Sequence, residues 1–101
     1  MKLFNFFKRK SPSSDSGLFS GGNGTSFDDA IVIHTKSSII GIPLERRKLA
    51  ELYGTEGADC TLEQRYSTSE KGRSFDVYDI RFKSGTTASV YFDITNFFGK
   101  M

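Results

Sequence analysis

Apolar and polar residues alternate with a period of two in three successive segments of the second half of the chain. The positions that share one face are Cys60, Leu62 and Tyr66 in the first segment, Tyr78, Ile80 and Phe82 in the second, and Ala88, Val90, Phe92 and Ile94 in the third. Such alternation is typical of β-strands with one buried and one solvated face. Residues 69–72 and 83–86, which lie between the segments, each contain a glycine suited to a tight turn. The pattern predicts a three-stranded antiparallel meander.

Polar side chains occupy the alternate positions of these segments. They are Thr61, Glu63, Arg65, Asp79, Arg81, Thr87, Ser89 and Asp93, and we expect them on the solvated face. Phe75 and Val77 depart from the alternation, which indicates either a bulge or a contact on the far face of the sheet. Phe97 and Phe98 follow the last strand, and we expect them to cap the open end of the core, with an exposed dimer contact as the alternative.

A helical pattern precedes the meander. Pro43 suits the first position of a helix, and Gly54 suits the residue after its end. On a helical wheel the apolar side chains between them lie on one side and the charged ones largely on the other; the two sets are Leu44, Leu49, Leu52 and Tyr53, and Glu45, Arg46, Arg47 and Glu51. We therefore predict an amphipathic helix over residues 43–53. Before it, residues 30–33 form a short run rich in β-branched side chains, which is typical of a buried strand.

The predicted order of elements is a strand, a helix and a three-stranded meander. This order favours an α+β fold with two layers, in which the helix packs on the apolar face of an antiparallel sheet. The expected contacts join Leu49, Leu52 and Tyr53 of the helix to Ile80, Val90 and Phe92 of the sheet. The pattern leaves the order of the strands in the sheet open.

Composition divides the 101-residue chain into three parts. Residues 1–10 form a basic amphipathic segment, residues 11–26 are dominated by Ser and Gly, and residues 27–101 contain the periodic segments. A Ser/Gly-rich stretch buries too little apolar surface to offset its conformational entropy, so we expect residues 11–26 to be a flexible linker. The length and the 37% content of apolar residues predict that residues 27–101 form a single α+β domain.

The basic character of the chain belongs to its N-terminal segment. Its large apolar side chains, Leu3, Phe4, Phe6 and Phe7, gather on one side of a helical wheel, and the basic triplet Lys8, Arg9 and Lys10 follows them. The segment is too short for a transmembrane span and lacks the cleavage site of a secretory signal. Three interpretations are open: an interfacial segment on an anionic membrane, a docking helix for a partner or for its own domain, and a disordered tail.

Three short phrases carry a resemblance. SFDDAIVI near the start of the domain, LAELYG at the end of the predicted helix and YFDITNFFGK near the C-terminus are similar to signatures of a group of small, uncharacterised bacterial proteins. The resemblance covers residues 25–100. It implies a bacterial source, and it implies no activity or functional residue, because that family has no assigned activity.

Candidate catalytic side chains are few. Cys60 and His34 are the single Cys and the single His of the chain, and a Cys–His pair could hold a thiolate nucleophile. Cys60 lies at an inward strand position, however, where a free Cys packs as a small hydrophobic side chain. A single Cys cannot form a disulfide within the chain, and one Cys with one His does not provide the ligand spacing of a structural zinc site. The scarcity of Cys favours an intracellular location.

Acidic and aromatic motifs are equally weak signals. Asp28 with Asp29, and Asp76 with Asp79, could form carboxylate pairs, but their spacing places the two members on opposite sides of a turn or strand, so we expect solvated residues. Residues 71–78, KGRSFDVY, partly match an RNA-recognition strand. Nucleic-acid binding is not expected, because Arg73 occupies the position of a base-stacking aromatic side chain.

These observations favour a small non-enzymatic binding or adaptor domain in the cytoplasm, with peripheral association with the inner face of the membrane through residues 1–10. The sequence does not specify a partner protein, and it indicates no cofactor and no metal. It leaves open whether the chain forms a homodimer. Two alternatives are a small enzyme that uses Cys60 and His34 or surface carboxylates, and a homo-oligomeric structural protein.

Overall fold

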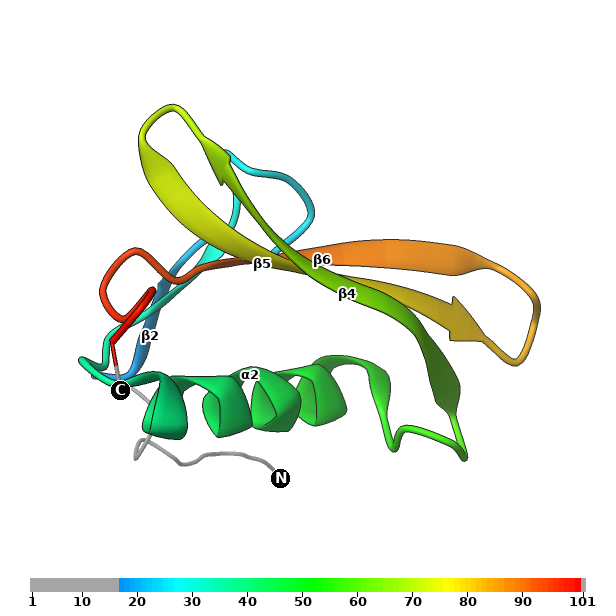
Figure 1. Cartoon of the computed structure of the whole chain (residues 1–101). Coiled ribbons are helices and arrows are strands. Elements are labelled where there is room, and N and C mark those ends of the chain that lie inside the picture. The colour runs from blue at the N-terminus through cyan, green and yellow to red at the C-terminus, as the bar shows by residue number, and fades with distance from the viewer. Residues whose placement is uncertain (1–16, 101) are drawn as a thin grey trace, which may run out of the picture.

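The computed structural model describes residues 17–100, and these residues form an α+β fold. The elements are the strands β2 (Phe19–Gly21) and β3 (Ile31–Ile33), the helix α2 (Ser38–Tyr53), and the strands β4 (Cys60–Glu70), β5 (Arg73–Phe82) and β6 (Thr87–Asp93). Within the described residues the strands form a five-stranded sheet with the order β2-β3-β6-β5-β4 (Figure 1). β3 and β6 are parallel, and the other neighbours are antiparallel. The predicted α+β class is confirmed, whereas the sheet is larger than a three-stranded meander and is mixed rather than antiparallel.

β2 lies inside the stretch that we expected to be a linker. Phe19 pairs with Ile33 and Gly21 with Ile31, and the Phe19 side chain packs against the core. Gly24 is buried, and its carbonyl accepts a hydrogen bond of 2.8 Å from the amide of Tyr91. The linker prediction is therefore wrong from residue 17 onward, because backbone pairing and one aromatic side chain order a stretch of low apolar content. Residues 11–16 lie outside the described residues.

The meander contains an irregularity in β4. Leu62 pairs with Ile80, but the register shifts between Leu62 and Gln64, so that Arg65 pairs with Tyr78. Directly paired residues point to the same face of a sheet. One extra residue in a strand therefore moves every later side chain of that strand to the face opposite the one that simple alternation predicts. Arg65 therefore faces the helix side, and Tyr66 faces away and is 39% exposed. The predictions of an inward Tyr66 and an outward Arg65 are wrong for this reason.

The far face of the sheet has its own aromatic contacts. The ring of Phe27 lies 4.9 Å from the ring of Phe75 and 4.9 Å from that of Tyr91, both edge-on. Val77 is fully buried on this face. Of the two interpretations of Phe75 and Val77, the contact on the far face is the one observed, and β5 continues without a bulge.

The helix begins five residues earlier than predicted. Ser37 is its N-cap, and the Ser37 hydroxyl oxygen accepts a hydrogen bond of 3.1 Å from the amide of Ile39. Pro43 therefore lies inside the helix, where its missing N–H leaves the carbonyl of Ile39 without its usual helical donor. The cap at Ser37 satisfies an amide that would otherwise be unpaired, and this offsets part of that loss. The C-terminal prediction is confirmed, since Gly54 has φ +91° and donates to the carbonyl of Ala50.

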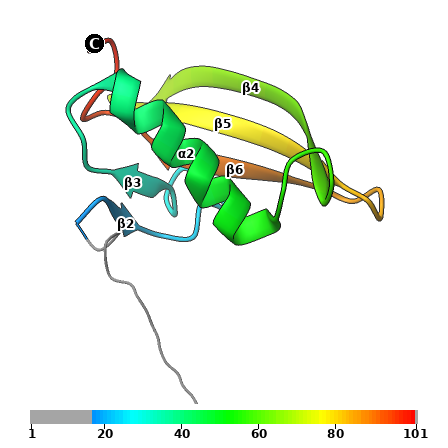
Figure 2. The same cartoon turned by 90° about the horizontal axis from the view of Figure 1, so that it is seen from below.

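Figures 1 and 2 show α2 alongside one face of the sheet, and its side chains enter the same core as those of the strands. The buried core consists of Ile31, Ile33, Leu44, Cys60, Tyr78, Ile80, Val90, Phe92, Ile94 and Phe97. The Tyr53 ring lies 5.5 Å from that of Phe82. Leu52 is 44% exposed and Glu45 is fully buried, so the predicted helix faces are wrong at these two positions.

Gly41 allows the C-terminal turn to approach the helix. It is buried in α2, and a Cβ atom placed there would lie 2.5 Å from Cε2 of Phe97. Phe97 is itself 2% exposed, so its ring has little room to withdraw. A glycine in a helix interior is normally unfavourable, and here the aromatic contact requires it.

We expect Gly41→Ala to lower the free energy of unfolding by about 1–3 kcal/mol, because overpacking against Phe97 outweighs the roughly 1 kcal/mol by which Ala favours a helix over Gly. Urea unfolding followed by circular dichroism measures the change. Adding Phe97→Leu to Gly41→Ala should cost less than the sum of the two single substitutions. An unchanged or higher stability of Gly41→Ala would contradict this packing.

Candidate functional site

A polar cluster lies between α2 and the sheet. The hydroxyl of Tyr78 donates to Oε1 of Glu45 at 2.5 Å and accepts from Nε of Arg65 at 3.1 Å. The other end of the Arg65 guanidinium donates to Asp76 Oδ2 at 2.9 Å, and the Ser67 hydroxyl donates to Oδ1 of the same carboxylate. Glu45, Tyr78 and Asp76 are at most 1% exposed. The cluster therefore links the helix to β5 through the buried Tyr78–Glu45 hydrogen bond, and links β5 to β4 through hydrogen bonds that are partly buried.

Local structure explains why these side chains meet. Asp76 and Tyr78 are two residues apart in β5, so they point to the same face of the sheet. The bulge in β4 turns Arg65 and Ser67 to that face as well. Glu45 lies one helical turn after Gly41, on the side of α2 that approaches the sheet. Three elements thus supply one cluster.

Burial controls the charge of Glu45. Removal from water, and after it the nearby Asp76 carboxyl group, raises the pKa of the Glu45 carboxyl to about 9, although Tyr78 and Arg65 act to lower it. Among the described residues, Oε2 of Glu45 is buried without a hydrogen-bond partner. Protonation gives the Glu45 carboxyl a donor beside Asp76, and a neutral carboxylic acid therefore suits the cluster better than a second carboxylate. Burial and then the adjacent Glu45 also raise the pKa of Tyr78.

Part of the cluster reaches a hollow of about 170 Å³ at the surface. Arg65, Ser67 and Asp76 form its polar wall, and the apolar side is lined by Ile42, Ile94, Phe97 and Phe98. Glu45 and Tyr78 lie behind this wall and are fully buried. The arrangement ties the helix to the sheet through Glu45 and Tyr78.

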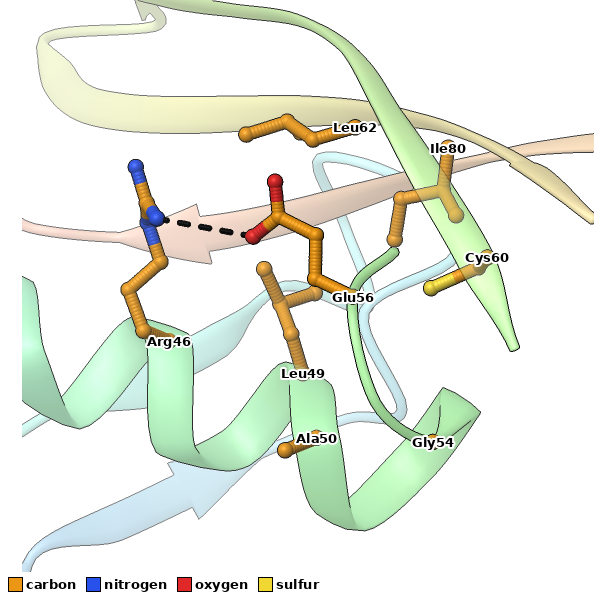
Figure 3. A pocket seen from close by; sticks show the side chains of 8 residues that line it. All are labelled: Arg46, Leu49, Ala50, Gly54, Glu56, Cys60, Leu62 and Ile80. Carbon is orange, nitrogen blue, oxygen red and sulfur yellow. Dashed lines mark ion pairs between the residues drawn. The ribbon is translucent and has the colours of Figure 1, made fainter. Parts of the chain in front are cut away.

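A second cavity, of about 90 Å³, lies between the C-terminal half of α2 and the start of β4 (Figure 3). Its apolar side chains converge from α2, β4 and β5, and they are Leu49, Ala50, Cys60, Leu62 and Ile80. Arg46 and Glu56 form an ion pair of 3.6 Å beside it, with both side chains about half exposed. Exposed pairs of this kind contribute about 0–1 kcal/mol, so the cavity depends on its apolar lining.

The sheet keeps Cys60 and His34 apart. Cys60 begins β4, whereas His34 directly follows β3, and β5 and β6 lie between these strands. Three strand spacings correspond to roughly 14 Å, which excludes a direct Cys–His pair. Nε2 of His34 instead lies 2.6 Å from the Ser20 hydroxyl, and Cys60 is buried as a core residue.

The acidic pairs also separate. Asp28 and Asp29 lie in an exposed turn, where the hydroxyl of Ser26 accepts from the amide of Asp29. Asp76 and Asp79 point to opposite faces of β5, as predicted, but the expectation that Asp76 is solvated is wrong, because Arg65 compensates its buried charge. Within residues 17–100, no three His, Cys, Asp or Glu side chains are grouped so as to hold a metal ion.

The predicted contact residues Leu3, Phe4, Phe6, Phe7, Lys8, Arg9 and Lys10 lie outside the described residues. In the part of the chain that the structure describes, no helix is long and apolar enough to cross a membrane. Of the partial RNA motif, Phe75 and Tyr78 are both buried, on opposite faces of β5, and so form no exposed stacking surface.

Sequence reasoning missed the polar cluster. Strand alternation could have revealed Asp76, because it shares the face of Tyr78 and Ile80. The burial of Glu45 and the inward turn of Arg65 depend on tertiary packing and on the bulge. Comparisons of the chain with protein-family models, with curated proteins and with solved structures gave no match. Functional conclusions therefore rest on the geometry of this chain.

The raised pKa of Glu45 predicts how stability depends on pH. The folded carboxyl keeps its proton up to about pH 9, whereas the unfolded one loses it near 4.5, so unfolding releases a proton between these values. Stability from this group is fully present below about pH 4.5 and is lost as the pH rises, with a slope of up to about 1.4 kcal/mol per unit. Glu45→Gln should therefore gain stability relative to the natural chain as the pH rises from 5 to 8.

Urea unfolding at several pH values measures this difference. The matched control is Glu51→Gln on the same helix, where the Glu51 side chain is 43% exposed and pairs with Arg47 and Lys48. Its stability relative to the natural chain should change little with pH over the same range. A Glu45→Gln difference that stays constant with pH would show that Glu45 is ionised in the folded protein.

Proposed function

We propose that the protein is a small non-enzymatic binding or adaptor domain that associates peripherally with anionic membranes, at the inner face of the cytoplasmic membrane. The contact would use residues 1–10 together with one end of the folded domain. The observation that carries the proposal is an exposed group of large apolar side chains, flanked by lysines, at the end where the described chain begins.

Several hydrogen bonds hold together the chain segments at this end of the domain. The amide of His34 donates to the carbonyl of Leu18 at 2.8 Å, and three residues later Ser37 caps the helix. The amide and the hydroxyl of Ser38 both donate to the carbonyl of Lys100, at 2.9 and 2.7 Å. The start of α2, the C-terminal turn and the point where residue 17 enters the domain are therefore close neighbours, and Figure 1 shows the C-terminus beside the first turn of the helix.

The apolar side chains at this end are unusually exposed. Ile39 is 67% exposed, Ile40 is 55% exposed and Phe98 is 55% exposed. We call these three residues the end patch. Phe97, the neighbour of Phe98, packs against Gly41, which places the end patch around the first turn of α2. Exposed apolar side chains that gather at one place on a surface can mark a protein or membrane contact.

Basic residues flank the end patch. Lys36 and Lys100 are exposed and line a surface hollow together with His34, Thr35 and Asn96. The sequence before residue 17 adds Lys8, Arg9 and Lys10, as well as the apolar Leu3, Phe4, Phe6 and Phe7. A combination of basic and large apolar side chains is typical of surfaces that bind the interface of anionic membranes.

Magnitudes indicate weak and reversible binding. Full burial of an Ile or Phe side chain contributes about 1.5–3 kcal/mol, and each basic side chain near an anionic surface contributes about 1 kcal/mol. The loss of translational freedom and the ordering of chain segments oppose these gains by a comparable amount. Neither the end patch nor residues 1–10 would therefore suffice alone.

Sedimentation with vesicles tests the proposal. The full chain should bind vesicles that contain phosphatidylglycerol, bind much less to pure phosphatidylcholine, and dissociate as salt is added, because salt screens the basic residues. Ile39→Ser with Ile40→Ser should weaken binding about tenfold or more, and Phe4→Ser with Phe7→Ser should do the same. Leu52→Ser is the matched control, since Leu52 is an exposed apolar residue near the other end of α2.

Equal binding by the natural chain and by the Ile39→Ser and Ile40→Ser variant would remove the end patch from the contact. No binding of the natural chain to either kind of vesicle would contradict membrane association altogether.

A further inference from the structure

β4 forms one edge of the sheet. It is the last strand in the order β2-β3-β6-β5-β4, and Figure 2 shows it at the opposite side of the sheet from β2. With 11 residues it is also the longest strand of residues 17–100. Within these residues, β5 is the one strand that pairs with β4. A bridge joins Cys60, the first residue of β4, to Glu56, and beyond it the backbone groups along the other side of β4 have no strand partner. Such groups are strong donors and acceptors that a further strand could satisfy.

The edge carries few of the features that prevent strand pairing. Edges are usually blunted by charged side chains, proline, bulges or short length. Residues 64–69 contain no proline, and their one charged side chain, Arg65, turns to the inner face and bonds Asp76. The bulge lies before this stretch, between Leu62 and Gln64. The opposite edge, β2, has only three residues and so offers little to a partner.

We propose that β4 pairs with β4 of a second copy of this chain, antiparallel and about a two-fold axis, to form a dimer with one continuous sheet. A two-fold contact uses the long edge of both copies and then closes. A head-to-tail contact would need the three residues of β2 or the short part of β6 that β3 does not cover. The dimer uses backbone groups of β4, and the membrane contact uses the end patch and residues 1–10. Failure of one proposal would therefore not contradict the other.

Side-chain pairing favours one register. With Ser67 opposite Ser67 of the second copy, Tyr66 lies opposite Thr68 of the second copy, and this pair occurs twice. Aromatic and β-branched side chains are favourable cross-strand neighbours. A register centred on Arg65 would instead place two guanidinium groups opposite each other, which is unfavourable. The proposed register keeps Arg65 opposite Ser69 of the second copy.

Sedimentation velocity of the full chain over a range of concentrations tests the dimer. A mass of twice 11.3 kDa is expected at high concentration. Tyr66→Lys with Thr68→Lys should weaken the dimer by about tenfold or more, because like charges directly opposite each other destabilise a strand pair. Thr87→Lys is the matched control and should leave the dimer intact, because Thr87 is exposed on β6 and pairs with Arg81 of β5, away from β4.

A charge-reversed partner separates a lost contact from a lost fold. Mixing the Tyr66→Lys and Thr68→Lys chain with a Tyr66→Glu and Thr68→Glu chain should restore a dimer of the two, since the proposed register puts opposite charges face to face. A natural chain that remains a monomer at the highest concentration would overturn the proposal. So would a dimer that the lysine substitutions leave unchanged, or a mixture of the two charged chains in which no dimer returns.

Discussion

The contact on which the arrangement of helix and sheet depends is the buried carboxyl group of Glu45. A carboxyl group removed from water is costly unless it is neutral and hydrogen-bonded. The Tyr78 hydroxyl meets one of its oxygens at 2.5 Å, and the Arg65–Asp76 ion pair lies beside it. These partners come from both strands next to the helix, so sliding or rotating α2 would break the Glu45–Tyr78 hydrogen bond and separate Glu45 from Arg65, whose Nε lies 4.0 Å from Oε1. The position of α2 in turn fixes the end patch at its first turn and the apolar cavity beside its last turns.

Features with a local cause could be predicted from the sequence. The α+β class, the three meander strands and the end of the helix at Gly54 follow from alternation and from the conformational freedom of glycine. The start of the helix was misplaced, because Pro43 is a strong local signal and the cap at Ser37 is a weaker one. β2 was missed because its three residues lie in a Ser/Gly-rich stretch and gain order only by pairing with β3. The mixed sheet likewise depends on the long-range contact of β3 with β6.

The candidate site was less accessible to sequence reasoning than the fold. Asp76 stood at an inward strand position, but only the bulge after Leu62 brings Arg65 to the same side to compensate it. A helix pattern that groups Glu45 with neighbouring charged residues assigns it to solvent, whereas the structure buries it. Phe97 and Phe98 were expected to act alike, yet Phe97 fills the space above Gly41 and Phe98 remains exposed. Both proposed contacts use what this packing leaves uncovered: the end patch and the outer side of β4.

The protonation state of Glu45 in the folded protein tests this account most directly. A carbon-13 NMR titration of the Glu45 side-chain carboxyl, with Glu45→Gln used to assign its signal, reports the pKa of this single group. The account predicts a neutral carboxyl at pH 7 and a titration midpoint near 9. A midpoint near the ordinary value of about 4.5, with the fold intact, would show that an ionised Glu45 is tolerated beneath the helix and would contradict the proposed role of this contact.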